Sequence, residues 1–148
     1  MADRLPLTDD LAALLNRALS LSKFFPNLNK RDLEQALQES ALYLYPKGAQ
    51  IISEGQEGKD LFVIFKGSAS VYRDQNGARQ AIGKLQAGDL FGEVGLMRDG
   101  HRTATVIAEE TSSIFRLTYS DIAYHLRKNP QLGEHLRSIA NGRSAPPA

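Results

Sequence analysis

The sequence predicts an α+β fold in which an antiparallel β sandwich or jelly roll has helices before and after it. Leucines at helical spacing occupy the first forty residues, short β-prone segments alternate with glycine-containing turns over 42–117, and helical spacing returns after that. The chain has 148 residues, of which 42% are hydrophobic and 24% are charged. This length and composition are typical of one globular domain.

The N-terminal segment, residues 1–40, predicts two helices. Asp9 or Asp10 can cap the first, and Asn29 can cap the second with Asp32 in its first turn. The apolar residues at helical spacing are Leu11, Leu14, Leu15, Ala18, Leu19 and Leu21 in the first helix and Leu33, Ala36 and Leu37 in the second. The simplest interpretation is a pair of helices that pack on the rest of the domain.

The central segment, residues 41–118, predicts the β core. Its segments rich in β-branched and aromatic residues are 42–45, 50–52, 61–65, 69–73, 80–85, 104–108 and 113–117. Asn76-Gly77 is the strongest hairpin signal, because both residues tolerate the positive φ of a tight turn. Seven strands at this spacing favour an antiparallel sandwich or jelly roll.

The C-terminal segment, residues 119–141, predicts two further helices. Thr118 and Asp121 stand three apart, as in a capping box. Pro130 ends the first helix, since it disfavours helical geometry in the residue before it. The second helix, over 131–140, carries the large apolar residues Leu132, Leu136 and Ile139.

Several function classes are excluded by composition. The net charge of +1 provides no basic field for nucleic acid, and the chain has no Cys. No His lies within four residues of another, and the apolar runs are short. The N-terminus lacks the apolar core of a secretory signal. We therefore expect a cytoplasmic protein with no metal, no cofactor, no membrane partner and no nucleic-acid partner. Residues 142–148 have a linker-like composition, which suggests one module of a longer protein.

The stretch 88–106 carries the chemistry. Gly92 allows a sharp entry into residues 93–97, which are long enough for about one helical turn. A helix start offers unpaired N–H groups, and Gly95 has no Cβ, so a ligand can approach the backbone there. Arg102 adds a planar fork of donors that suits an anionic oxygen pair. These features predict a phosphate cradle.

Glu93 is unexpected in a site for a pure anion. A carboxylate there is explained if the ligand is also a sugar, because it can accept a hydrogen bond from a ribose hydroxyl. A ribose with one phosphate and one free hydroxyl suits both Glu93 and Arg102, and Thr103 adds a hydroxyl. The alternative is a plain ion pair between Glu93 and Arg102 on the surface of a loop.

These residues resemble the phosphate-binding cassette of the cyclic-nucleotide-binding domain family, which includes catabolite activator proteins, cyclic-nucleotide-dependent kinases and cyclic-nucleotide-gated channels. The family pattern is Phe-Gly-Glu, a hydrophobic residue, Ala or Gly, Leu, a variable loop, and then Arg, a small residue and Ala-Thr. The chain has Phe91-Gly92-Glu93-Val94-Gly95-Leu96 and Arg102-Thr103-Ala104-Thr105. The matching positions further upstream include Gly48, Gly55, Gly58, Gly67 and Gly88. The resemblance covers about 24–141 and implies a jelly-roll barrel flanked by N-terminal helices and C-terminal hinge and lid helices, with the cassette at 91–105.

The resemblance also implies residue roles. Glu93 would bind the ribose 2′-hydroxyl, Arg102 the cyclic phosphate, and the backbone N–H groups of Gly95 and Thr103 would complete the cradle. The full set of ligand-binding residues it implies is Ile82, Gly92, Glu93, Val94, Gly95, Leu96, Arg102, Thr103 and Ala104, with Ile82 facing the purine. The residues of the lid that would cover the base are Leu136, Arg137 and Ile139. Ordinary helix packing or surface exposure is the alternative for these last three.

Two positions depart from the family pattern. His101 stands where many members have Pro, which loosens the loop and places a titratable group near the phosphate unless the ring is simply exposed. Gly83 stands where some cyclic-GMP-selective kinase sites carry an Arg that contacts guanine, so the purine preference is open.

The sequence therefore predicts a non-enzymatic sensor for a cyclic mononucleotide, cyclic GMP or cyclic AMP, that signals through its C-terminal helices to a fused or associated effector. A second copy of the chain, in a homodimer, is a further possible partner. The alternatives are a cyclic-AMP-binding fragment of a transcription regulator of the catabolite-activator kind, a cupin-like metal enzyme, and a structural or dimerising domain that binds no nucleotide.

Overall fold

The computed structural model describes residues 2–25, 28–97, 100–142 and 148, and it confirms the α+β class. The described strands are β1 (Asp3–Leu5), β2 (Ala41–Tyr45), β3 (Gln50–Ile52), β4 (Leu61–Lys66), β5 (Ser68–Gln75), β6 (Ala78–Gln86), β7 (Leu90–Phe91), β8 (Thr105–Ala108) and β9 (Ser112–Leu117). The described helices are α1 (Asp9–Leu19), the 3₁₀ turn η1 (Leu21–Lys23), α2 (Lys30–Ala36), α3 (Glu93–Met97), α4 (Tyr119–Lys128) and α5 (Gln131–Asn141).

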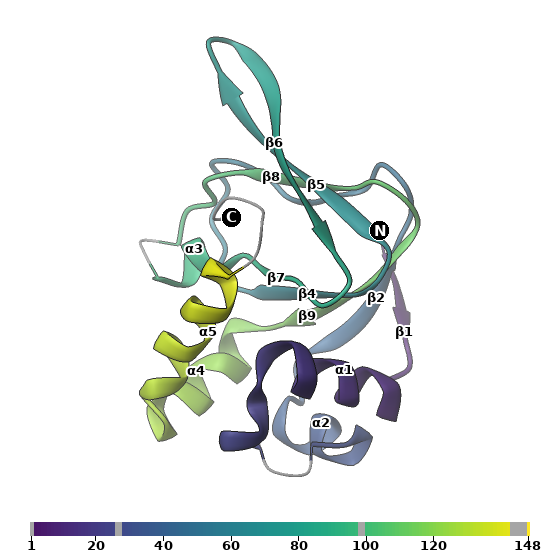
Figure 1. The fold of residues 1–148 in the computed structure, drawn as a ribbon, viewed down its shortest axis with the longest axis vertical. Helices are drawn as coiled ribbons and strands as arrows, with labels where there is room; N and C mark the ends of the chain where they lie inside the picture. The colour runs from purple at the N-terminus through teal and green to yellow at the C-terminus, as the bar shows by residue number, and fades with distance from the viewer. Residues whose placement is uncertain (1, 26–27, 98–99, 143–147) are drawn as a thin grey trace.

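The strands form two antiparallel sheets. Among the described residues, one sheet has the order β1-β2-β9-β4-β7 and the other β3-β8-β5-β6. Figure 1 shows α1, α2, α4 and α5 on one side of the first sheet, with the second sheet on its other side. The first sheet is therefore covered on both faces.

Strand β4 shows how the sequence encodes this layering. Leu61 and Val63 belong to the core between the first sheet and the helices, whereas Phe62 and Ile64 belong to the core between the two sheets. Because successive side chains of a strand point to opposite faces, a strand buried on both faces is apolar throughout. This explains the uninterrupted apolar run of β4.

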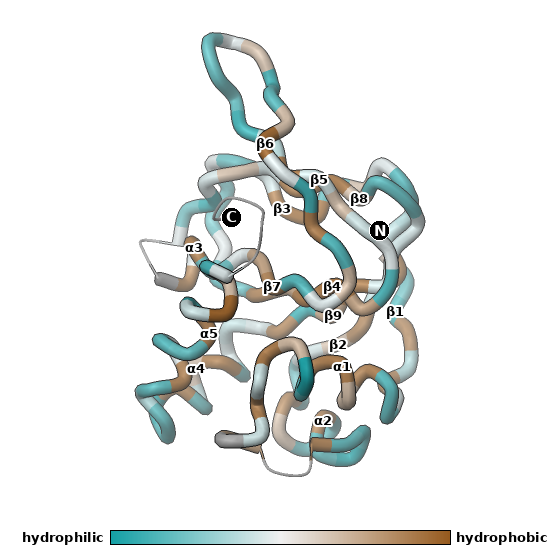
Figure 2. The backbone as a smooth tube through the Cα atoms, viewed as in Figure 1, coloured by the Kyte–Doolittle hydropathy of each residue, from teal (hydrophilic) through white to brown (hydrophobic). Residues whose placement is uncertain are grey.

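The hairpin of β5 and β6 confirms the turn predicted at Asn76-Gly77. Asn76 has φ +54° and Gly77 has φ +78°, the pair of positive values that a type I′ turn requires. The hairpin extends beyond the rest of the molecule, and its outer part is mainly hydrophilic (Figure 2).

The helix starts agree only in part with the sequence predictions. The prediction that Asp9 or Asp10 caps α1 is wrong, because Thr8 is the cap and its hydroxyl accepts from the Leu11 N–H at 3.1 Å. Asp9 instead accepts from the backbone N–H of Lys30 at 2.9 Å. The predicted cap of α2 is confirmed, since Asn29 and Asp32 form a complete capping box.

The start of α4 uses Asp121 differently from a capping box. The Thr118 hydroxyl caps the helix by accepting from the Asp121 N–H at 3.4 Å. The Asp121 carboxylate accepts from the Ser40 hydroxyl at 2.7 Å and from the Glu39 N–H at 3.0 Å. These bonds fix the start of α4 to the segment that leads into β2.

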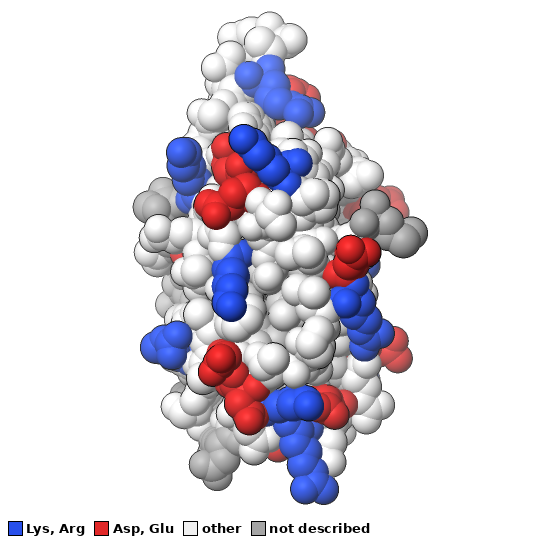
Figure 3. All heavy atoms as spheres, turned by 90° about the vertical axis from the view of Figure 1, so that its right-hand side faces the viewer, with Lys and Arg blue, Asp and Glu red and all other residues white. Residues whose placement is uncertain are grey.

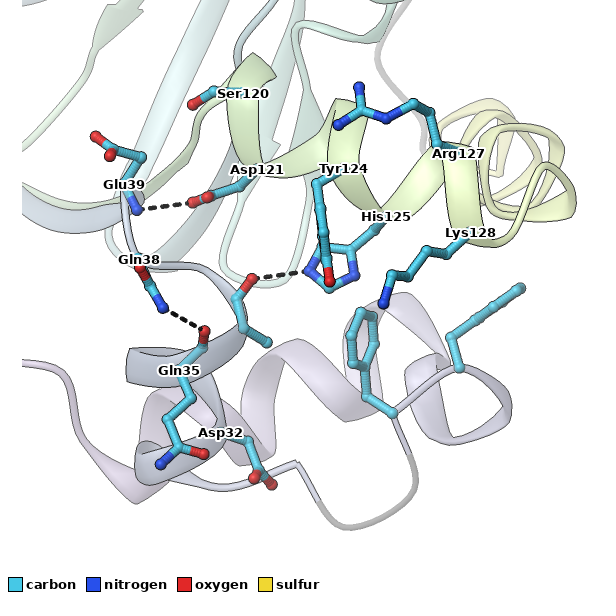
Figure 4. Close-up of a pocket in the computed structure, with 13 residues that line it drawn as sticks. Asp32, Gln35, Gln38, Glu39, Ser120, Asp121, Tyr124, His125, Arg127 and Lys128 are labelled. Carbon is cyan, nitrogen blue, oxygen red and sulfur yellow. Dashed lines mark hydrogen bonds between the residues drawn. The ribbon is translucent and has the colours of Figure 1, made fainter.

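Two histidines attach the C-terminal helices to the N-terminal ones. The His125 Nε2 atom lies 2.8 Å from the Ala36 carbonyl, and the His135 Nε2 atom lies 2.7 Å from the Leu19 carbonyl. A groove of about 980 Å³ lies between α2 and α4, and Figure 4 shows His125 pointing across it toward α2. The lining residues of this groove include none of the cassette.

The surface carries both signs of charge. On the face shown in Figure 3, Lys and Arg lie among Asp and Glu rather than in one patch. No helix in the described parts of the chain is long and apolar enough to cross a bilayer.

Candidate nucleotide-binding site

The cassette runs from β7 through α3 to the start of β8. Phe91 is fully buried and its ring stacks on Phe62 with centroids 5.2 Å apart, which anchors the entry to the core between the sheets. Gly92 follows with φ +91°, a conformation that L side chains rarely adopt. The structure thus confirms the predicted sharp entry and the short helix after it.

Arg102 is held in the cassette by both arms of its guanidinium. Its Nη1 atom donates to the Gly92 carbonyl and its Nη2 atom to the Asp60 carbonyl, each at 2.9 Å. The residue is 5% exposed. Burial lowers the pKa of the Arg102 guanidinium, and the nearby carboxylates of Asp60 and Glu93 oppose that shift. A planar fork fixed in this way presents a positive charge with little freedom to move.

Glu93 and two backbone N–H groups face a common occupant, the main chain of Ala148. The N–H groups of Gly92 and Val94 donate to the Ala148 carbonyl oxygen at 2.9 and 3.3 Å. The Ala148 N–H donates to the Glu93 carboxylate at 3.2 Å. The site therefore offers two donors to one oxygen and a carboxylate acceptor beside them.

The burial of Glu93 and Arg102 argues against the surface ion pair considered above. Glu93 is 4% exposed and Arg102 is 5% exposed, and Arg102 donates a hydrogen bond to the carbonyl of Gly92, the residue before Glu93. Buried charged groups persist only where partners compensate their lost hydration. Glu93 and Arg102 are therefore buried groups of the cassette rather than a surface ion pair.

The structure gives a second reason for glycine at position 95, and the approach of a ligand to its backbone stays a prediction. A Cβ at Gly95 would collide with the Gly58 carbonyl oxygen and would lie 3.2 Å from the Arg102 Nη1 atom. The missing side chain thus makes room for another part of the backbone and for Arg102. At Gly58, likewise, a Cβ would lie 2.9 Å from the Arg102 Nε atom.

The other predicted site residues surround this centre. Ala104 is fully buried, and Val94 is 9% exposed. Leu96 packs against the core on the helix side, and Ile82 packs against the core between the sheets. Thr103 is partly exposed, and its carbonyl accepts from the Arg73 Nε atom at 3.1 Å.

The His101 side chain is exposed, which was one of the two alternatives for this residue. Its Nε2 atom lies 3.8 Å from the Glu57 carboxylate, and an isolated β-bridge joins the two residues. The two residues before Gly100 lie outside the described part of the chain.

The three lid candidates of α5 have different surroundings. Leu136 is buried in the core on the helix side, and Ile139 packs against the same core. Arg137 is half exposed and pairs with Glu134 at 2.6 Å. This arrangement shows α5 packed on the domain, and its action as a lid stays a prediction.

Asp60 was missed by the sequence analysis, although it joins the cassette to α4. Its carbonyl binds Arg102, its Oδ1 atom accepts from the Tyr119 N–H at 2.7 Å, and its Oδ2 atom accepts from Arg116 Nε at 2.7 Å. The signal for the first role is absent from the sequence, because every residue has a carbonyl. The described residues contain no cluster of three or more His, Asp or Glu placed to hold a metal ion.

Comparison with known proteins identifies the family. The family model for the cyclic nucleotide-binding domain matches residues 44–129, which is more than half of the chain. The chain belongs to the cyclic nucleotide-binding domain family.

Two relatives and one solved structure illustrate the similarity. The domain is 32% identical over 124 residues to a cAMP-dependent protein kinase regulatory subunit of Mycosarcoma maydis, covering 82% of this chain and 24% of the relative. It is 38% identical over 96 residues to human cGMP-dependent protein kinase 2, covering 64% of this chain and 12% of the relative. This chain thus spans a quarter or less of these relatives.

The fold is also that of known cyclic nucleotide-binding domains. A cyclic nucleotide-binding domain from Methylobacillus flagellatus matches with a TM-score of 0.78 at 22% identity, covering 96% of this chain and 83% of that chain. The predicted jelly roll with flanking helices is therefore confirmed.

Proposed function

We propose that this domain is a non-enzymatic sensor that binds a cyclic mononucleotide in the cassette at 91–105 and passes occupancy to an effector, fused or associated, through α4 and α5. In this proposal Arg102 holds the cyclic phosphate together with backbone N–H groups, both those of Gly95 and Thr103 that the resemblance implies and those of Gly92 and Val94. Glu93 accepts from the ribose 2′-hydroxyl. No metal or cofactor takes part in binding. We expect the protein to work in the cytoplasm.

One observation carries the proposal. The Gly92 and Val94 N–H groups converge on a single oxygen, and the Glu93 carboxylate accepts a hydrogen beside it. A ribose phosphate presents the same pattern, with an anionic oxygen next to a hydroxyl donor. Hydrogen bonds to charged groups are about twice as strong as neutral ones, so this arrangement favours an anion over a neutral ligand.

Calorimetric titration with cyclic AMP, cyclic GMP and a cyclic dinucleotide tests the proposal. We expect saturable one-site binding of at least one cyclic mononucleotide and none of the dinucleotide. Absence of heat and of any shift in melting temperature with all three would refute it and favour a domain that binds no nucleotide.

We expect cyclic GMP to bind at least as well as cyclic AMP. In family members that favour cyclic GMP, a Thr or Ser after the phosphate Arg contacts the guanine 2-amino group, and Thr103 occupies this position. The relatives include both a cGMP-dependent kinase and a cAMP-dependent kinase regulatory subunit, so the expectation rests on Thr103. One neutral hydrogen bond contributes only about 0.5–1.5 kcal/mol, so the preference should be modest.

Thr103→Ala is the test of this preference. It should weaken cyclic GMP binding by about 2- to 12-fold, which corresponds to that one hydrogen bond, and should change cyclic AMP binding less. Thr118→Ala is the control, because it makes the same substitution outside the cassette, at the cap of α4. Equal losses for the two ligands, or a tenfold preference of the unmodified protein for cyclic AMP, would contradict the assignment.

Two contacts connect the cassette with the C-terminal helices. Asp60 binds Arg102 through its carbonyl and the first N–H of α4 through its carboxylate. Leu96 of α3 packs against the core that contains Leu132 and Leu136 of α5. A ligand that repositions Arg102 or α3 therefore alters the surroundings of both helices, and a hinge at Pro130 can absorb their movement.

Hydrogen exchange should reveal this coupling. We expect nucleotide to slow backbone exchange at 131–140 as well as at 91–104, because α5 closes over the ligand. The turn of the β5–β6 hairpin serves as an internal control and should not change. Protection confined to the cassette would mean that α5 is not the moving part.

A further inference from the structure

Ala148, the last residue of the sequence, occupies the centre of the candidate site. Its side chain is fully buried and belongs to the core between the two sheets. Figure 1 shows this end of the chain beside α3. Ala148 follows a segment of linker-like composition, so its full burial calls for a physical reason.

The contacts of Ala148 supply that reason. Its carbonyl takes both N–H donors, Gly92 and Val94, and its N–H satisfies the Glu93 carboxylate. A buried polar group without a partner costs about 1–3 kcal/mol. The Ala148 carbonyl oxygen satisfies the buried Gly92 and Val94 N–H groups at once, and its N–H adds a donor to the Glu93 carboxylate.

We propose that the main chain of Ala148 is an internal ligand of the cassette that competes with the nucleotide. The inference rests on the proposed function, because it takes the same donors and the same carboxylate as the ribose-phosphate site. The two occupants are mutually exclusive, since each would use the Gly92 and Val94 N–H groups and Glu93.

The expected size of the effect follows from competition within one molecule. A tethered group has an effective concentration on the order of millimolar, so weak contacts are enough to fill a site. If Ala148 occupies the cassette in about nine molecules of ten, the apparent Kd for nucleotide rises about tenfold. Removing the internal ligand should therefore tighten nucleotide binding by about tenfold.

Three variants test the competition by titration with the nucleotide that binds best. Deletion of residues 143–148 removes the internal ligand, and Ala148→Glu keeps the chain length but sets a second carboxylate beside Glu93. Both should bind nucleotide about tenfold more tightly than the unmodified chain. Ala148→Gly retains every main-chain contact and is the matched control, expected within about threefold of the unmodified chain. Equal affinity in all four proteins would overturn the proposal.

Hydrogen exchange without nucleotide separates this inference from the proposed function. The deletion and Ala148→Glu should speed exchange at the Gly92 and Val94 N–H groups, whereas Ala148→Gly should not. If no variant binds nucleotide but the deletion speeds exchange at these two groups, the proposed function fails and the internal contact stands. If nucleotide binds but the deletion changes neither affinity nor exchange, the internal ligand is refuted and the proposed function stands.

Discussion

Arg102→Ala should abolish useful nucleotide binding. The guanidinium is buried, fixed by two carbonyls and placed beside Glu93, so its removal leaves the ligand phosphate without its positive partner. Removing one partner of a desolvated charge pair costs roughly 2–5 kcal/mol, or about 30-fold to several-thousand-fold in affinity. Titration calorimetry measures this loss directly.

Controls must separate binding from folding, because Arg102 also links Gly92 to Asp60. Arg102→Lys keeps the charge but loses the fork, so it should also weaken binding. Arg17→Ala removes an exposed Arg from α1 and should leave affinity unchanged. Urea unfolding shows whether each variant is folded at the titration temperature. Binding by Arg102→Ala within threefold of the unmodified protein would show that the site has been assigned wrongly.

Much of the fold could be predicted because its signals are local. The Asn76-Gly77 turn and the Asn29 cap depend on residues whose preferred backbone conformation or side-chain reach is short-range, and both appear as expected. Strand β1 was missed because three residues, Asp3–Leu5, are too few to show alternation. Its pairing with β2 is a tertiary contact.

The errors at helix starts have a similar origin. Asp9 and Asp10 are good caps by residue type, yet Thr8 precedes them and has the extended backbone that a cap requires. A Thr followed by two acidic residues was the signal for it. Asp121 has the spacing of a capping box, but its carboxylate instead accepts a hydrogen bond from the hydroxyl of Ser40, which is distant in the sequence.

In the candidate site, too, some residues could be predicted from the sequence and others could not. Glu93 and Arg102 could be located because their residue types are unusual in a short glycine-rich loop. The roles of Asp60 and Gly58 toward Arg102 could not be predicted, since Asp60 contributes a backbone carbonyl and Gly58 contributes only the space left by its missing side chain. The position of Ala148 was missed because its segment has the composition of a linker, and composition says nothing of main-chain contacts made across the fold.

Gly67→Ala should cause a large loss of stability without touching the site. Gly67 connects β4 to β5 with φ +103°, and an added Cβ would collide with the Ser112 hydroxyl and lie 2.8 Å from the Ser112 Cα atom. Ser112 cannot give way, because its hydroxyl accepts from the Ser68 N–H and donates to the Glu110 carbonyl. The left-handed backbone costs about 1–2 kcal/mol and overpacking about 1–3 kcal/mol. We expect the free energy of unfolding to fall by about 2–5 kcal/mol.

Gly48→Ala is the matched control for this loss. Gly48 has φ +86° and no atom within 4 Å of an added Cβ, so it incurs only the backbone cost of about 1–2 kcal/mol. Urea unfolding measures the free energy of unfolding of both variants. If the denaturant slope m is the same in both, the difference between their losses of stability is the cost of the collision with Ser112. Equal losses would mean that Ser112 moves aside at no cost and that the β4–β5 connection is less tightly packed than the structure shows.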